Sequence, residues 1–252
     1  MSYYLWTLRK LIEHSNSYLV VIPTYNEIEN IHNLIAEFKK FEFSVLFVDD
    51  NSPDGTGELI AQLSETNKQI NLLQRSSKKG LGSAYREGFE WGINNGYDYF
   101  IEMDADFSHS FEDLEKILQV SANYDLVIGS RYVIDGGSEG WDFKRKMLSS
   151  LANTTSRILL KSKIKDMTSG FRCYSKKSLI EIQYELTKSD GYAFQIEMTL
   201  RCVVKKLSIQ EVPIIFNERR VGKSKMSKKI VVEALFFLFN NGIKRWLNLK
   251  II

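Results

Sequence analysis

The sequence predicts an α/β protein with a mainly parallel sheet and helices on both of its faces. Strand-like and helix-like segments alternate along the first 135 residues, and no repeat or low-complexity stretch interrupts them. The strand-like runs are apolar throughout and do not alternate with polar residues. Such continuous apolar strands are typical of parallel sheets, because helices cover both sides of them.

Five strands are expected in this first part of the chain. Each is a short apolar run that ends in polar or turn-forming residues. They are YLVVIP (18–23), SVLFVDD (44–50), INLLQR (70–75), YDYFIEMD (97–104) and DLVIGSRY (125–132).

Helices are expected between these strands, because apolar residues there recur at helical spacing. In segment 28–41, for example, Ile31, Leu34 and Phe38 share one face. Gly96 is expected to end the third helix in a left-handed conformation. The expected helices are 28–41, 57–67, 80–96, 111–122, 142–161 and 192–207, with a turn-rich stretch at 167–175 and a late strand at 208–216.

We expect one catalytic domain over residues 18–229, preceded by an N-terminal extension (1–17) and followed by an amphipathic C-terminal helix (230–252) that is a candidate for facing a membrane. The apolar stretch 230–243 contains Glu233 and is shorter than the roughly 20 apolar residues needed to cross a bilayer. No secretory signal is apparent in residues 1–17. The expected protein is therefore soluble or peripheral.

Composition sets broad limits on function. The chain has 252 residues, of which 44% are apolar and 26% are charged, which is typical of a globular protein. The net charge is only +3, but cations concentrate in segment 217–229, a pattern that indicates phosphate, anionic lipid, nucleic acid or a solvated face. Cys173 and Cys202 lack metal-ligand spacing, so we expect reduced thiols.

Polar motifs follow several of the expected strands, at the edge where parallel sheets bind ligands. In VDDNSPDGT, a strand–turn–helix corner with aspartates that cap backbone amides explains the residues as well as a nucleoside site does. In the nucleoside interpretation, Asp50 accepts hydrogen bonds from a base or ribose.

The stretch EMDADFSHS places three acids at the end of a buried strand. Asp104 and Asp106 suit a divalent cation that phosphate oxygens also hold, since magnesium and manganese favour such mixed shells. The alternative is a helix N-terminus, where acids are also favoured. Glu102 fits the metal site less well and is expected to lie in the interior of the sheet or behind the site. A phosphatase with a nucleophilic aspartate is disfavoured, because the motif follows the fourth strand and not the first.

Several cations lie near the elements that carry these acids. Any single one is expected to be a surface charge, but together they suit a ligand with several phosphates. Nucleic acid is disfavoured, because carboxylates in the same site repel its backbone. The sequence has no G-x-S-x-G or G-K-[ST] motif, and KKGLGSAYREG lacks the dinucleotide-binding spacing. The cations are Arg131, Arg145, Lys146, Arg172, Arg219 and Lys225.

Taken in order, these motifs resemble those of family 2 glycosyltransferases over about residues 18–230. The motifs are VVIPTYNEIENI, VDDNSPDGT, KKGLGSAYREGF, MDADFSH, VIGSRY, TSGFR and EVPIIFNERRVGKSKM. TSGFR and RRVGKSKM favour the dolichol-phosphate (polyprenyl-phosphate) mannose synthase branch. The resemblance implies a GT-A glycosyltransferase fold, which is a Rossmann-like, mainly parallel sheet.

The resemblance also implies the reaction. It is an inverting, metal-dependent transfer of mannose from GDP-mannose to dolichyl or polyprenyl phosphate, as in a dolichyl-phosphate β-D-mannosyltransferase, with Mg²⁺ or Mn²⁺ as cofactor. A phosphate acceptor is already anionic, so no strong general base is needed. The alternative is a family 2 enzyme that uses another sugar nucleotide, such as UDP-glucose or UDP-GlcNAc, or a hydroxyl acceptor with Asp190 or Glu197 as base.

Matching positions in the resemblance define the expected site. Asp106 and Arg131 are expected to be catalytic, and Asp104, Asp106 and Ser108 to hold the metal. Arg131, Arg145 and Ser149 are expected to bind the acceptor phosphate. The expected donor-binding residues are Pro23, Tyr25, Glu27, Val48, Asp50, Asp104, Ala105, Asp106, Arg131, Arg219 and Lys225.

The expected location is the cytoplasmic face of a membrane, which is the endoplasmic reticulum in a eukaryote or the plasma membrane in a prokaryote. The amphipathic segment 144–161, the basic loop and the apolar 230–243 helix indicate peripheral attachment beside a lipid substrate. Small membrane-anchoring subunits are candidate partners, and nucleic acid is not expected to be one.

Overall fold

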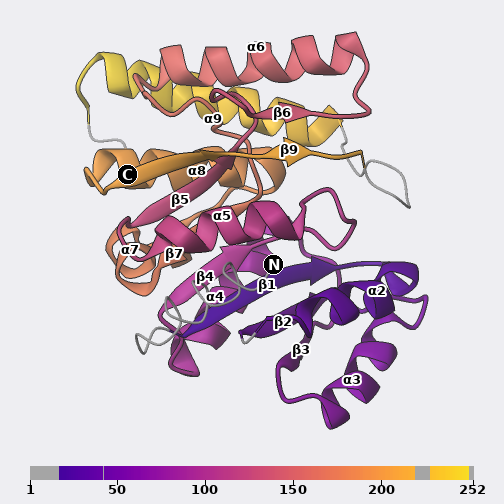
Figure 1. The fold of residues 1–252 in the computed structure, drawn as a ribbon. Coiled ribbons are helices and arrows are strands. Elements are labelled where there is room, and N and C mark those ends of the chain that lie inside the picture. Colours follow the sequence, from indigo (N-terminus) through magenta and orange to yellow (C-terminus); the bar gives the residue numbers. More distant parts are fainter. Residues whose placement is uncertain (1–16, 42, 219–227, 250–252) are drawn as a thin grey trace.

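The computed structural model describes residues 17–41, 43–218 and 228–249. Within these residues, seven strands form one mixed sheet in the order β3-β2-β1-β4-β7-β5-β8 (Figure 1). The pairings of β1 with β2 and β4, of β2 with β3, and of β5 with β8 are parallel. The strands are β1 (Tyr18–Thr24), β2 (Ser44–Asp49), β3 (Ile70–Gln74), β4 (Tyr99–Glu102), β5 (Leu126–Ser130), β7 (Arg172–Ser175) and β8 (Ile209–Pro213).

Helices cover both faces of this sheet, as the sequence predicts. On β1, Val20 and Ile22 pack into one core with α2, α3 and α5, whereas Leu19 and Val21 pack into a second core with α4, α7 and α8. Successive side chains of a strand point to opposite faces, so one apolar strand serves both cores. The helices are α2 (Ile28–Phe38), α3 (Thr56–Thr66), α4 (Leu81–Asn94), α5 (Phe111–Ser121), α7 (Lys176–Ile182) and α8 (Gly191–Val204).

The strand β7 lies where the sequence analysis expects only turns. It inserts between β4 and β5 and is antiparallel to both. The sequence gives little sign of it, because its four residues, RCYS, form no apolar run. Arg172 is nevertheless fully buried, which places a positive charge inside the sheet next to Glu102 of β4.

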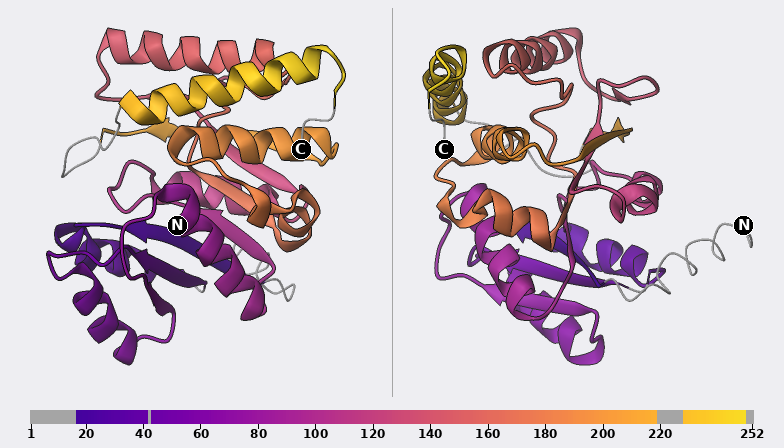
Figure 2. Two further views of the ribbon diagram at one scale, coloured as in Figure 1. Left: turned by 180° about the vertical axis from the view of Figure 1, so that it is seen from behind. Right: turned by 90° about the vertical axis from the view of Figure 1, so that its left-hand side faces the viewer.

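Two long helices form an additional layer at one end of the molecule. They are α6 (Phe143–Leu159) and α9 (Lys228–Trp246), which contact each other, and α9 also packs on α8 (Figures 1 and 2). The helix α9 begins two residues before the expected boundary at 230. A short pair of strands, β6 (Gly137–Ser138) and β9 (Ile215–Phe216), and the 3₁₀ turn η1 (Tyr184–Leu186) complete the fold. No helix among the described residues is long and apolar enough to span a bilayer.

Candidate active site

A cavity of about 610 Å³ opens beyond the carboxyl ends of β1, β2, β4 and β5. It gathers predicted residues that lie more than 100 positions apart in the chain. Those that line it are Pro23, Tyr25, Glu27, Asp50, Asp104, Ala105, Asp106, Arg131 and Arg145. The expected position of a ligand site at this edge of the sheet is therefore matched by a cavity of suitable size for a small molecule.

One end of the cavity is formed by the corner after β2, where the two aspartates have different positions. Asp49 builds the turn: its Oδ2 accepts a hydrogen bond from the Ser52 amide at 2.9 Å. Asp50 instead lines the cavity, and its carboxylate pairs with buried Arg75 at 2.6 Å. Burial raises the pKa of Asp50, and the Arg75 charge opposes that shift. The sequence analysis missed Arg75, which follows β3 without a recognisable motif.

Residues after β1 form the adjoining wall. Lys78 lies over the Tyr25 ring at 4.0 Å from its centroid, and Glu27 accepts a hydrogen bond from Asn30 at 2.9 Å. Val48 does not line the cavity among the residues described: its side chain is fully buried against α4, close to Gly88. The expected contact between the Val48 side chain and the donor is therefore not supported by its position, which is in the core behind the wall.

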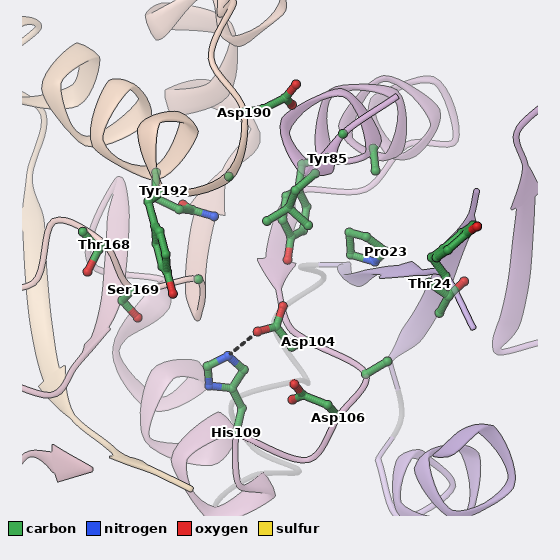
Figure 3. Close-up of a pocket in the computed structure, with 18 of the residues that line it drawn as sticks. Pro23, Thr24, Tyr85, Asp104, Asp106, His109, Thr168, Ser169, Asp190 and Tyr192 are labelled. Carbon is green, nitrogen blue, oxygen red and sulfur yellow. Dashed lines mark ion pairs between the residues drawn. The ribbon is translucent and has the colours of Figure 1, made fainter. Parts of the chain in front are cut away.

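The acid pair lies at the centre of the cavity, directly after β4 (Figure 3). Asp106 is 5% exposed, and its Oδ1 accepts hydrogen bonds from the Ser108 hydroxyl at 2.6 Å and the Ser108 amide at 3.0 Å. The Asp104 side chain is 39% exposed and lies 3.6 Å from the His109 ring. The two carboxylates therefore differ: one is fixed by its own loop and the other is more open to the cavity.

The donor set fits a magnesium or manganese ion that is completed by phosphate. Among the described residues no cluster of three or more His, Cys, Asp or Glu side chains forms a metal cage. Two carboxylates on a cavity wall are what a cation shared with a diphosphate requires. Ser108 is fully buried, is not one of the described residues that line the cavity, and donates its hydroxyl to Asp106. We therefore revise the expected ligand role of Ser108 to one of orienting Asp106.

His109 is buried behind the acid pair and lines the cavity. Its ring stacks on Phe171 at 4.5 Å between centroids and meets the edge of Phe216 at 5.4 Å. These aromatic contacts fix the plane of the imidazole beside Asp104. The stacking partners come from distant segments of the chain, which the sequence alone does not link to His109.

Glu102 lies inside the sheet, as one of the two sequence interpretations expects. It is fully buried and is paired in register with Arg172 of β7. Burial raises the pKa of Glu102 to about 7, while the charge of Arg172 and the amide of Gln195 oppose that shift. Arg172 itself donates to the carbonyls of Ser169 and Met167 and to other buried acceptors. The acid is therefore part of the wall behind the cavity and not of its surface.

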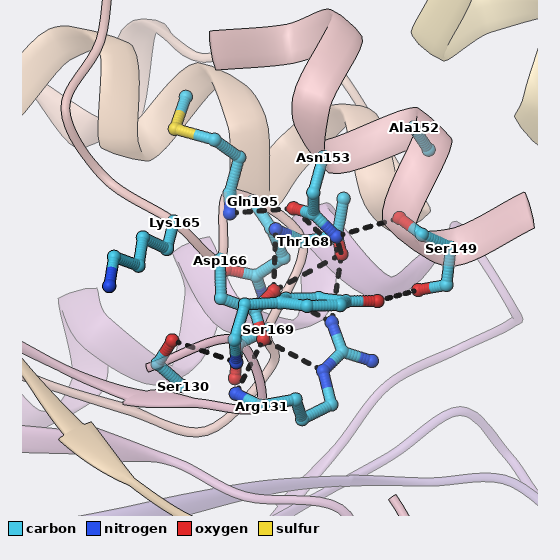
Figure 4. A network of polar contacts seen from close by, with 12 residues as sticks. Ser130, Arg131, Ser149, Ala152, Asn153, Lys165, Asp166, Thr168, Ser169 and Gln195 are labelled. Carbon is cyan, nitrogen blue, oxygen red and sulfur yellow. Dashed lines mark hydrogen bonds and ion pairs between the residues drawn. The ribbon is translucent and has the colours of Figure 1, made fainter. Parts of the chain in front are cut away.

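The other end of the cavity contains a clamped arginine. Arg131 donates from Nε and Nη2 to the two oxygens of Asp166, each at 2.7 Å, and from Nη2 to Thr168 at 2.9 Å (Figure 4). Burial raises the pKa of Asp166, but the Arg131 charge and hydrogen bonds outweigh this and lower it. Asp166, which the sequence analysis did not select, thus fixes the guanidinium that lines the cavity.

Aromatic contacts also position the guanidinium groups at the end of the cavity that contains Arg131. The centroid of the Trp141 ring lies 4.2 Å from the Arg145 guanidinium and 5.5 Å from the Arg131 guanidinium. Ser149 does not line the cavity among the residues described; its hydroxyl accepts a hydrogen bond from Tyr132 at 2.7 Å. Its expected contact with an acceptor phosphate therefore stays a prediction. Arg219 and Lys225 lie outside the described residues.

Glycines at the start of α4 let a distant loop approach the cavity. Asp190 accepts a hydrogen bond from the Gly82 amide at 2.9 Å, and a side chain at Gly80 would collide with the Asp190 carboxylate. The Asp190 amide in turn donates to Glu233 of α9 at 2.9 Å. Glu197 is held by Arg201 at 3.0 Å and by two backbone amides. The glycine-rich stretch therefore serves close packing, which explains why its spacing matches no dinucleotide motif.

Fold and site together define a class. It is an α/β protein with one cavity that contains an acid pair and two positioned arginines, and such a cavity suits a polyphosphate ligand and a second anion. The family model described as glycosyl transferase family 2 matches residues 19–183. The chain belongs to this family and is a glycosyltransferase.

Two curated relatives cover nearly the whole chain. "Polyprenol monophosphomannose synthase" of Mycolicibacterium smegmatis is 44% identical over 230 residues, which is 90% of this chain and 87% of the relative. "Undecaprenyl-phosphate mannosyltransferase" of Micrococcus luteus is 42% identical over 235 residues, or 92% and 97% of the two chains.

Solved structures support the GT-A fold. A Pyrobaculum calidifontis mannosyltransferase, PcManGT, in complex with GDP-Man and Mn²⁺, has a TM-score of 0.53 at 14% identity, covering 96% of this chain and 69% of that one. GalNAc-T7 with UDP, GalNAc and Mn²⁺ has a TM-score of 0.58 at 15% identity, covering 92% and 49%.

Proposed function

We propose that this enzyme transfers mannose from GDP-mannose to a polyprenyl or dolichyl phosphate. The observation that carries the proposal is the arrangement of one cavity, with the acid pair Asp104 and Asp106 at its centre and Arg131 and Arg145 at one end. The names of the two relatives at 42–44% identity support the acceptor and the sugar. The complex of PcManGT with GDP-Man supports the donor.

A Mg²⁺ or Mn²⁺ ion held by Asp104 and Asp106 would supply charge to bind the donor diphosphate and to stabilise the departing GDP. Ser108 keeps the Asp106 carboxylate in one orientation. We further propose that Pro23, Tyr25, Glu27 and Asp50 bind the nucleoside end of the donor, since they line that part of the cavity.

The acceptor end needs cations and no base. A phosphate monoester is already anionic near neutral pH, so its oxygen attacks the sugar carbon without loss of a proton. Arg131 is fixed by Asp166, and Arg145 lies over Trp141, so both guanidiniums are positioned before the acceptor arrives. A single displacement with the acceptor opposite the diphosphate inverts the anomeric carbon and gives a β-mannosyl phosphate.

A hydroxyl acceptor or another sugar nucleotide is the second candidate. It is favoured by one observation, namely that Asp190 lines the cavity and is a carboxylate that could serve as base. Against it, an oxygen of Asp190 already caps the Gly82 amide, and Glu197 pairs with Arg201. Transfer to a hydroxyl acceptor in place of the lipid phosphate would support this alternative.

We also propose that the α6–α9 layer rests on a membrane, which would place the acceptor end next to its lipid. Arg145 is on the first turn of α6 and lines the cavity, and both helices expose several large apolar side chains. A lipid phosphate could then enter with its chain still in the bilayer. The proposed location is the cytoplasmic face. The exposed apolar residues are Phe143, Met147, Leu148, Leu151 and Ile158 on α6 and Val232, Leu235, Phe236, Phe239, Ile243 and Trp246 on α9.

The direct test is transfer of labelled mannose from GDP-mannose to a short polyprenyl phosphate. We expect product with Mg²⁺ or Mn²⁺ and none after chelation. Asp106→Ala should lower the rate at least about 1,000-fold while the thermal unfolding midpoint stays similar, because the carboxylate serves the ligand more than the core. Activity that persists with chelator, or in the Asp106→Ala variant, would refute the proposal. UDP-glucose and UDP-GlcNAc are the control donors.

A further inference from the structure

Within the part of the chain that the structure describes, two buried side chains on the cavity wall have polar ends without a partner. Tyr85 is fully buried and Gln195 is 2% exposed, and both line the cavity. Among the described residues, no hydrogen bond of normal geometry satisfies the Tyr85 hydroxyl or either polar atom of the Gln195 amide. Buried polar groups are nearly always paired in native proteins, because an unmade hydrogen bond is unfavourable. A missing partner is therefore expected at this place.

Neither side chain is free to turn away and find a partner elsewhere. The Tyr85 ring stacks on Phe89 and Phe194, each at 5.9 Å between centroids. Gln195 is on α8, and its backbone carbonyl accepts a hydrogen bond from buried Arg172 at 2.9 Å. The ring of Tyr85 and the backbone of Gln195 are thus fixed in the wall of the cavity. Such an arrangement is preorganised for a ligand and not for the interior of the protein.

These polar ends lie between the acid pair and the acceptor end. Figure 3 shows the Tyr85 hydroxyl directed toward Asp104. Next to burial, the negative charge of Asp104 is the largest contribution that raises the pKa of Tyr85. The Gln195 amide nitrogen is close to Gly170, which lines the cavity between Ser169 and Phe171. In the proposed reaction the sugar must lie between the diphosphate at Asp104 and Asp106 and the attacking phosphate at Arg131.

We infer that the Tyr85 hydroxyl and the Gln195 carboxamide bind hydroxyl groups of the transferred hexose. A sugar hydroxyl both donates and accepts, so it can satisfy a phenol and an amide at once. Glu102 lies behind Gln195, whose amide lowers the pKa of Glu102, but the contact between the two side chains lacks normal hydrogen-bond geometry, so the polar atoms of both remain unsatisfied among the described residues. The inference rests on the proposed function and adds to it the residues that recognise the hydroxyl groups of the transferred sugar. An ordered water at the same place is the competing explanation.

The experiment compares wild type with Tyr85→Phe and Gln195→Met, which remove the polar ends and keep the approximate shape. Each enzyme is given GDP-mannose and a panel of GDP-mannose analogues that lack one sugar hydroxyl each. Wild type should use at least one analogue about tenfold or more less well than GDP-mannose, by kcat/KM. For that analogue, the ratio of kcat/KM with GDP-mannose to kcat/KM with the analogue should fall toward one in the variant that lacks the side-chain partner of the missing hydroxyl. GDP lacks the mannose group, so its affinity should be unchanged in both variants.

Tyr174→Phe is the matched control. Tyr174 is also fully buried on this side of the sheet, but its hydroxyl accepts a hydrogen bond from Arg172 at 3.1 Å, and it is not one of the described residues that line the cavity. We expect this variant to unfold at a lower temperature and to keep the wild-type analogue ratios. Tyr85→Phe should unfold at the wild-type temperature or above, because its hydroxyl has no partner to lose among the described residues.

The outcomes separate the two proposals. If wild type transfers mannose but both variants keep every analogue ratio, water fills the site and the inference is wrong. If Tyr85→Phe lowers stability as Tyr174→Phe does, the hydroxyl has a structural role and the inference is also wrong. If wild type transfers no mannose, the proposed function fails before the sugar contacts are tested.

Discussion

Ser108 is the residue that sets the direction of Asp106. Its hydroxyl and amide both donate to the same carboxylate oxygen. Ser108→Ala removes one of these two bonds, and loss of one charge-assisted hydrogen bond is worth about 1.5–3 kcal/mol. We expect kcat/KM for mannose transfer to fall about 10- to 100-fold and the metal concentration for half-maximal activity to rise.

The control for this variant is Ser110→Ala. The Ser110 hydroxyl caps α5 by accepting a hydrogen bond from the Asp113 amide at 3.0 Å. Its removal should lower stability by about 1 kcal/mol and leave the metal dependence unchanged. The same metal titration for Ser108→Ala and wild type would contradict the orienting role of Ser108.

Asp166 should make stability depend on pH at the acid end. Its carboxyl has a lowered pKa in the folded protein because of Arg131, although burial acts in the opposite direction. A lowered folded pKa stabilises the protein above the unfolded pKa of about 3.9, and this stabilisation is lost as the pH falls through the folded value. Asp166→Asn should lower stability by roughly 3–5 kcal/mol at pH 7 and flatten the decline below about pH 4. Unfolding midpoints from pH 3 to 7 would show it, and parallel curves for both proteins would contradict it.

At the scale of elements, the longer helices and the parallel strands could be predicted, whereas the short helix α7 and the strand β7 could not. The five early strands are long apolar runs, so burial on both faces leaves a visible pattern. The strand β7 consists of RCYS and is stabilised by non-local contacts, such as Arg172 with the carbonyls of Ser169 and Met167. Hydrogen bonds of this kind leave no periodic signal in the sequence.

The residues of the site also divide into those that the sequence pattern reveals and those that depend on non-local contacts. Residues in local motifs, such as Asp50, Asp104 and Asp106, could be selected because they follow predicted strands. Arg75 and Asp166 could not, because their importance comes from a partner far away in the chain: Asp50 for the first and Arg131 for the second. Proximity in space between distant segments is the information that a single sequence lacks.

The loop before α4 gives a prediction at this scale. Gly80 has a φ of 99°, and a side chain there would collide with Asp190. Gly80→Ala should therefore lower stability by about 2–4 kcal/mol and weaken GDP binding, because the cavity wall must move. Gly96→Ala is the matched control: its φ is 82°, but no atom of the described residues lies within 4 Å of the position that an alanine methyl group would take. It should cost only about 1 kcal/mol and leave GDP binding unchanged. Equal effects of the two substitutions would refute the collision.

For the whole molecule, the α6–α9 layer predicts lipid binding. Leu148 on α6 is 58% exposed and Phe236 on α9 is 73% exposed. The double variant Leu148→Glu and Phe236→Glu should reduce flotation with anionic liposomes about tenfold or more, because charge replaces apolar contact with the bilayer. Ile180→Glu, on α7 and 54% exposed, is the control and should float like wild type. Equal flotation of all three proteins would contradict the proposed orientation.

The contact between Glu233 and the Asp190 amide has a practical consequence for how the enzyme is handled. Glu233 lies within the C-terminal helix, yet it is also part of the cavity wall. A shortened chain that ends before α9, prepared to avoid exposed apolar surface, would lose this side chain and the support of the loop at 189–191. Donor affinities measured on such a fragment would then describe a different pocket, and ligand discovery should use the chain with α9 intact.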